Sequence, residues 1–231
     1  LYCGFLDAIE VFDVSRPGSG TRLPTTPSRK SKDGLKGIIS ALAFVPSHTS
    51  DLYAAGSLSP TPSNTALFSS TQPEPVMFVS GAPRAGVTQV SAGVTSQAKL
   101  IRPKIQFNPA APHLMYTAHR RHATIYAWDL RTHLDAPLAA YTLTHAALTN
   151  QKIKFDVDLG GRWLASGDHV RFPSPSVLSV LLTYPFHQRG HIYLFDLHDP
   201  EATTSSLTST EPTTTTTTTT HTPTLEYIAH D

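Results

Sequence analysis

The sequence predicts an all-β fold made of repeated small sheets, because a strand pattern recurs and helical periodicity is missing. Three apolar strands end in an aromatic residue followed by aspartate, at Ile9–Asp13, Ile125–Asp129 and Ile192–Asp196. In each of them apolar residues stand two apart, as a half-buried strand requires. No long segment keeps apolar residues at the i, i+3, i+4 and i+7 spacing of an amphipathic helix. Such self-similarity is typical of a chain of equivalent structural units.

Each unit can be divided into four strands, labelled a to d in chain order. The a strands are Ile38–Pro46, Lys104–Pro109 and Ile153–Asp158. The b strands run from apolar into small residues, which permit close packing near an axis: Leu1–Gly4, Leu52–Ser57, Leu114–Ala118 and Trp163–Gly167. The aromatic-Asp runs are the c strands, and the outer d strands are Pro75–Val79, Pro137–Tyr141 and Leu225–Ile228.

One c strand ends in the Trp128–Asp129 pair itself. The predicted fold class is therefore a WD-repeat β-propeller, incomplete over residues 1–231, with parts of about four blades. A β-sandwich with irregular strands and a low-complexity chain are the alternatives. Neither accounts for three aromatic-Asp strand ends beside four small-residue strands.

Three segments rich in Ser, Thr and Pro are predicted to be flexible loops, at 15–36, 57–75 and 202–223. The last includes eight consecutive threonines. These segments bury too little apolar surface to offset the entropy lost on ordering.

Two further insertions, at 91–103 and 169–189, interrupt expected blade elements. We interpret both as retained introns translated in a gene model, since each opens near a valine codon compatible with a GT donor, and Gln188 is compatible with a terminal CAG. Genuine surface insertions are the alternative. Leu1 begins within an apparent strand, so we also expect the true start of the chain to lie upstream.

Composition limits the function classes. The 18 Lys and Arg nearly balance the 17 Asp and Glu, so with a net charge of +1 any RNA contact has to be a local patch. A single cysteine, Cys3, excludes an internal disulfide and favours a reducing compartment, the nucleus or the cytoplasm. No run of about 18 apolar residues indicates a membrane span. No nucleophile elbow or phosphate-binding glycine loop appears, so we expect neither catalytic residues nor a cofactor.

Several segments together resemble the telomerase Cajal body protein family, as a truncated and fungal-like member. They are Leu1–Phe5, Val11–Gly18, Gly37–Phe44, Leu52–Ser57, Tyr126–Arg131 and Thr149–Asp158. The Ser-Arg-Pro-Gly step and the Thr-Asn-Gln entry into an a strand are the most distinctive. The resemblance extends discontinuously over Leu1–Gly167 and over Gly190–Leu197, and it fails at both insertions and along the threonine tract.

The resemblance implies a nuclear scaffold. It implies binding of small Cajal body RNAs with a short localisation box, and of telomerase RNA in animals, and delivery of their ribonucleoproteins to Cajal bodies. Related fungal proteins are instead associated with pre-mRNA splicing. A protein-only scaffold that grips peptides at its rim is the alternative, and the cytoplasm stays open as a location. In either case we expect ribonucleoprotein components or other proteins as partners, and no membrane.

Cationic side chains suited to RNA phosphates gather in two places. The first is the b–c turn of the third blade, with His119, Arg120, Arg121 and His122. The second is an a strand in which Lys152 and Lys154 alternate with apolar residues. Solvated surface residues are the alternative for both, as they are for the basic stretch Arg29–Lys32, which also fits a phosphate contact or an import signal.

The remaining polar candidates are expected to be structural. His119 and His122 have a spacing seen in metal pairs, but no cysteine or carboxylate follows closely to complete a tetrahedral shell, so we expect no metal. Asp13, Asp129 and Asp196 end the three c strands, and their repeated placement indicates hydrogen bonds within each blade, not acid–base chemistry.

Overall fold

The structure is a computed structural model, and it describes eleven stretches of the chain. These are residues 1–28, 30–31, 33–47, 50–59, 63–72, 74–80, 104–119, 122–143, 154–169, 190–198 and 219–229. Every regular element within them is a β-strand, which confirms the predicted all-β class. No helix in these stretches is long and apolar enough to cross a membrane.

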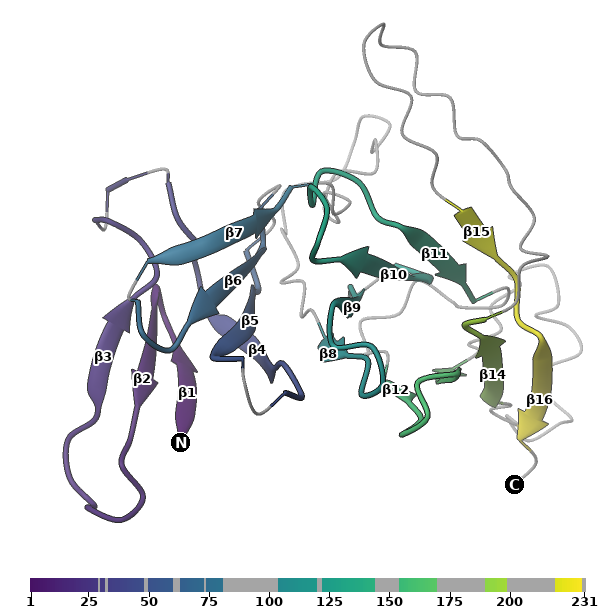
Figure 1. The fold of residues 1–231 in the computed structure, drawn as a ribbon, viewed down its shortest axis with the longest axis horizontal. Coiled ribbons are helices and arrows are strands. Elements are labelled where there is room, and N and C mark those ends of the chain that lie inside the picture. The colour runs from purple at the N-terminus through teal and green to yellow at the C-terminus, as the bar shows by residue number, and fades with distance from the viewer. Residues whose placement is uncertain are drawn as a thin grey trace, which may run out of the picture.

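The strands form four separate sheets that follow one another along the chain (Figure 1). The first sheet is antiparallel and contains β1 (Tyr2–Phe5), β2 (Ala8–Val11) and β3 (Thr21–Pro24). The second is a four-stranded meander of β4 (Ile39–Phe44), β5 (Leu52–Ser57), β6 (Thr65–Ser69) and β7 (Pro75–Val79). These two sheets lie beside the N-terminus in Figure 1.

The third and fourth sheets complete the described arc. The third contains β8 (Lys104–Phe107), β9 (Leu114–Ala118), β10 (Thr124–Asp129), β11 (Ala139–Thr142) and, parallel to β11 at the outer edge, β15 (Thr219–His221). The fourth contains β12 (Phe155–Val157), β13 (Trp163–His169), β14 (Gly190–Asp196) and β16 (Leu225–Ala229). Consecutive sheets of three to five strands that do not close into a ring confirm the predicted incomplete propeller.

The cores lie between neighbouring sheets, not inside a single sheet. Each of three apolar clusters is shared by two consecutive sheets: first with second, second with third, and third with fourth. Successive strand residues point to opposite faces. In β10, Ile125 accordingly belongs to the cluster shared with the fourth sheet, whereas Trp128 belongs to the one shared with the second. The alternation seen in the sequence therefore builds two seams from one strand.

Three segments expected to be loops each contain a strand. β3 lies within 15–36 and pairs with β2, β6 lies within 57–75 and is buried along its whole length, and β15 lies within 202–223. The loop expectation is wrong at these positions. The averaged composition of each segment hid a short strand. The backbone groups of these strands form hydrogen bonds with neighbouring strands, and the sequence of each strand shows no clear alternation of apolar residues.

The two suspected insertions lie almost wholly outside the described residues. Their flanks are informative in one case, because His169 pairs directly with Gly190 at the ends of β13 and β14. The chain on either side of residues 170–189 therefore continues one antiparallel ladder. β13 ends at His169, two residues beyond the expected end of the b strand in that blade.

Close approach of the first two sheets depends on a glycine. A Cβ added to Gly4 in β1 would overlap the carbonyl oxygen of Ile39 and stand 2.9 Å from the Ile39 Cβ. The contact joins β1 to β4, and an isolated bridge between Leu6 and Ile38 extends it. The small size of Gly4 therefore lets the backbone of β1 pack closely against the backbone of β4.

We expect Gly4→Ala to lower the free energy of unfolding by about 1–3 kcal/mol, because the added methyl forces β1 away from β4. Urea unfolding followed by tryptophan fluorescence measures the change. Gly167→Ala is the matched control, since a Cβ there meets nothing within 4 Å. Equal losses in both variants would contradict the packing role assigned to Gly4.

Candidate functional site

The b–c turn of the third sheet joins two well-paired strands. Ala118 at the end of β9 pairs with Ile125 in β10, so the connection between them starts from a fixed geometry. Arg120 and Arg121 lie outside the described residues. The two histidines that flank them are described, and they turn toward the ring of Tyr126, with ring centroids 6.2 Å away for His119 and 5.5 Å for His122.

His119 does not reach the surface. Its side chain is only 1% exposed, and neither ring nitrogen has a hydrogen-bond partner. Burial, with a smaller contribution from His122, lowers the pKa of His119 to about 4, so the ring is neutral at pH 7. His119 is therefore removed from the residues expected to contact RNA, because a buried neutral ring offers no cation to a phosphate. His122 is partly buried, and burial lowers its pKa as well.

Lys154 stands at the entrance to the fourth sheet and is exposed. Its backbone carbonyl accepts a hydrogen bond from Ser166 Oγ at 3.3 Å, which anchors the chain just before β12. The next residue, Phe155, is buried in the seam with the third sheet. The ammonium group therefore projects away from the core, and Lys152 lies outside the described residues.

The three strand-ending aspartates accept hydrogen bonds close to their own strands. Asp13 accepts from the backbone N and the Oγ of Ser15, at 2.9 and 2.7 Å. Asp129 accepts from the guanidinium of Arg131 through Nε at 3.0 Å and Nη2 at 2.7 Å. The hydrogen bond from Arg131 holds the pKa of Asp129 at about 2. The carboxylates of Asp13 and Asp129 are thus ionised, and both already accept hydrogen bonds.

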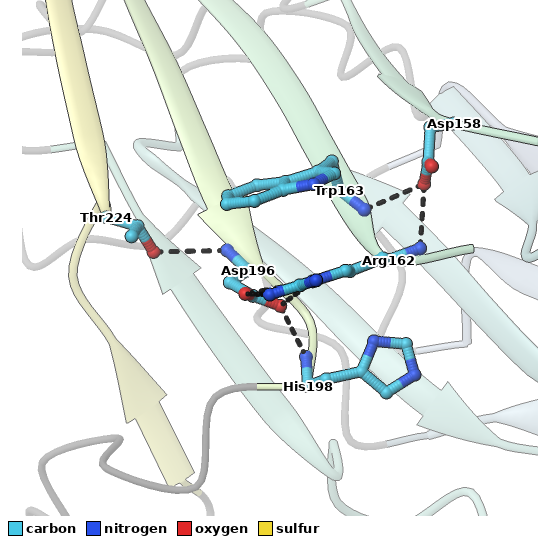
Figure 2. A network of polar contacts seen from close by, with 6 residues as sticks. All are labelled: Asp158, Arg162, Trp163, Asp196, His198 and Thr224. Carbon is cyan, nitrogen blue, oxygen red and sulfur yellow. Dashed lines mark hydrogen bonds and ion pairs between the residues drawn. The ribbon is translucent and has the colours of Figure 1, made fainter. Parts of the chain in front are cut away.

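The most extensive polar network ties together the strand ends of the fourth sheet (Figure 2). Its members are Asp158, Arg162, Trp163, Asp196, His198 and Thr224. The Asp158 carboxylate accepts from the backbone N of Arg162 and of Trp163, both at 2.7 Å. The Arg162 guanidinium donates to Asp196 at 3.2 and 2.8 Å. This arrangement closes the β12–β13 turn and joins it to the end of β14.

The network stabilises the fourth sheet and is poorly suited to binding anions. Arg162 lies over the ring of Trp163, with its Cζ 5.3 Å from the ring centroid. Its charge is already matched by Asp196, whose pKa is lowered by that hydrogen bond, and Asp158 adds a second carboxylate. Two carboxylates against one guanidinium repel a phosphate. Arg131 is likewise engaged by one carboxylate, that of Asp129.

Sequence reasoning missed a buried amide that joins two blades. Asn108, just after β8, donates through Nδ2 to the carbonyl of Gly161 in the fourth sheet at 3.0 Å. Its Oδ1 accepts from the backbone N of Ala110 and of Ala111. The Asn-Pro step after an a strand was the available signal, but the partner is 53 residues away in the chain. A second missed contact is internal to the third sheet, where Trp128 Nε1 donates to Thr117 Oγ1 at 2.9 Å.

No protein-family model matches the sequence. The telomerase Cajal body protein 1 of Rattus norvegicus is 33% identical over 170 residues, which are 73% of this chain and 26% of that protein. The proteins of the same name from Mus musculus and Homo sapiens are 32% and 29% identical over 170 and 167 residues. The chain thus spans about a quarter of the length of these relatives.

Solved structures that partly match this chain include the β-propeller domain of Cps50 (Swd1) from Myceliophteria thermophila. The similarity has a TM-score of 0.48 at 12% identity and covers 85% of this chain and 48% of that one. The WD40 domain of Pan2 from Neurospora crassa matches over 72% of this chain and 55% of its own, with a TM-score of 0.33 at 14% identity.

The sheets described above define part of a WD-repeat β-propeller. Its curated relatives confirm the resemblance to the telomerase Cajal body protein family, at 32–33% identity over 73% of the chain.

The buried histidine makes acid stability a measurable consequence of this geometry. The pKa of His119 in the folded chain lies below its ordinary value of 6.5, so the unfolded chain binds a proton more readily between pH 6.5 and about 4. Stability is therefore lost as the pH falls through this window, by up to about 3 kcal/mol from this residue.

We expect His119→Phe to reduce the loss of stability between pH 6.5 and 4 in urea unfolding, because the phenyl ring of the variant has no nitrogen to protonate. His133→Phe, at an exposed position, serves as the control. A His119→Phe profile that runs parallel to that of the parent chain over this window would show that His119 is not the group responsible.

Proposed function

We propose that this chain belongs to a scaffold that binds small nuclear RNAs of the Cajal body and directs their ribonucleoproteins within the nucleus. The observation that carries the proposal is the similarity to telomerase Cajal body protein 1 over 73% of the chain. That protein's name links it to telomerase and to the Cajal body. Since only 26% of it is spanned here, the activity of the whole protein is part of the proposal.

A binding role fits the way polar groups are used in the described residues. The strand-end carboxylates Asp129 and Asp196 are engaged by arginines and are not free for acid–base chemistry. The scaffold presents turns between paired strands, and such turns are where propellers carry their variable residues. The proposed phosphate contacts are Arg120, Arg121, Lys152 and Lys154, with His122 beside them.

RNA held through phosphates has a signature that a peptide site lacks. Each contact releases counterions from the RNA, so affinity falls steeply with salt, by a slope of about 0.7 per contact for a single strand. An apolar peptide site shows little such dependence. A salt titration therefore distinguishes the RNA scaffold from a protein-only scaffold.

We expect the double variant Arg120→Ala, Arg121→Ala in the full-length protein to bind a Cajal body RNA more weakly and to reduce the salt slope by roughly 1.4. Filter binding across a salt series gives both quantities. Arg16→Ala is the matched control, because Arg16 is exposed in the loop after β2, outside the proposed surface. Unchanged affinity and slope in the double variant would remove the b–c turn from the RNA surface.

A further inference from the structure

Two adjoining hollows lie beside β3 of the first sheet, and the larger one also reaches β7 of the second sheet. The larger has a volume of about 540 Å³, and its lining includes residues from the end of β3 and the start of β7, with Pro24 and Pro75 among them. The smaller, of about 440 Å³, shares Pro24, Thr26 and Pro27 with it. The size lies within the range of ligand sites in proteins. Neither hollow belongs to the proposed RNA surface.

The larger hollow has an acidic lining. Asp33 and Glu74 contribute carboxylates, and none of the described residues that line it is a Lys, Arg or His. Both residues are exposed, and Asp33 accepts one long side-chain hydrogen bond, from Ser31 Oγ at 3.4 Å. Within the described residues Glu74 forms no hydrogen bond or ion pair, and the neighbouring Lys30 pairs with neither carboxylate. In the described part of the chain, two carboxylates therefore face the hollow and neither is paired with a cation.

A largely buried threonine with an unpaired hydroxyl points to a ligand independently of these charges. Thr26 is only 8% exposed and lines both hollows. In the described part of the chain its side chain makes no hydrogen bond, whereas the adjacent Thr25 donates to the carbonyl of Leu35 at 2.6 Å. The hydroxyl oxygen itself keeps access to the hollow, so it is available to hydrogen-bond with a polar group bound there.

The walls suit a flat cationic group. Pro24, Pro27 and Pro75 have fixed backbone φ angles, so the lining is stiff before a ligand arrives. Phe78 contributes an aromatic ring to the same lining. A guanidinium stacks favourably on such a ring, and its N–H groups donate to carboxylates in a fixed fork.

We propose that this hollow binds an extended, arginine-bearing peptide segment of a partner protein. The carboxylates of Asp33 and Glu74 receive the guanidinium, Phe78 stacks against it, and Thr26 hydrogen-bonds to the peptide backbone. RNA does not fit this chemistry, because its phosphates would meet the carboxylates of Asp33 and Glu74. The site does not depend on the RNA scaffold described above and can exist beside it.

The test uses the full chain and a fluorescein-labelled peptide of alternating glycine and arginine, with a citrulline peptide as the uncharged counterpart. We expect the arginine peptide to bind in an anisotropy titration and the citrulline peptide to bind at least about tenfold more weakly. The double variant Asp33→Asn, Glu74→Gln is expected to weaken the arginine peptide to a similar degree. Thr26→Val, close in shape, is expected to weaken both peptides.

The matched control is Asp156→Asn, which removes one carboxylate from β12 in the fourth sheet, outside both hollows. It is expected to bind the arginine peptide as the parent chain does. Equal binding of the two peptides, or unchanged binding in the Asp33, Glu74 double variant, would overturn the proposal. The proposal would also be overturned if single-stranded RNA displaced the peptide from the parent chain but not from the Asp33, Glu74 double variant, because the hollow would then be an RNA site.

Discussion

The structure depends on the packing of each sheet against the next through strands whose two faces carry different side chains. In β10, Ile125 faces forward into the seam with the fourth sheet and Trp128 faces back into the seam with the second. In β14, Tyr193 and Phe195 fill the backward seam, whereas Ile192, at the position equivalent to Ile125, is 45% exposed. Because side chains alternate along each strand, one face of a blade packs on the preceding blade and the other on the following one. In the last described blade the forward face is left open.

Much of this arrangement follows from the sequence, because a c strand that ends in an aromatic residue and aspartate must alternate between two seams. That pattern located β2, β10 and β14, and the small-residue runs located β5, β9 and β13. β6 escaped notice because it ends in Phe68-Ser69 and lies in a Ser/Thr/Pro-rich segment. β3 and β15 were missed for a similar reason: they are short edge strands, held by hydrogen bonds to neighbours and not by their own apolar content.

The candidate site was less predictable than the fold, since burial and pairing decide what a polar residue can do. Spacing alone placed His119 beside two arginines, but packing against Tyr126 buries it as a neutral ring. Arg162 looks like a free cation in the sequence, yet Asp196 in the adjacent strand, 34 residues away, engages it. Conversely, the acidic hollow between the first two sheets joins Asp33 and Glu74, which no local motif connects.

The most direct test of the seam account is a double-mutant cycle between Tyr141 in β11 and Phe195 in β14. Their rings meet edge to face across the third and fourth sheets, with centroids 5.4 Å apart. Urea unfolding of Tyr141→Leu, Phe195→Leu and the double variant gives the coupling. We expect an interaction free energy of about 0.5–1.5 kcal/mol, as for aromatic pairs in contact. Additive losses would contradict the claim that consecutive blades are held together at this seam.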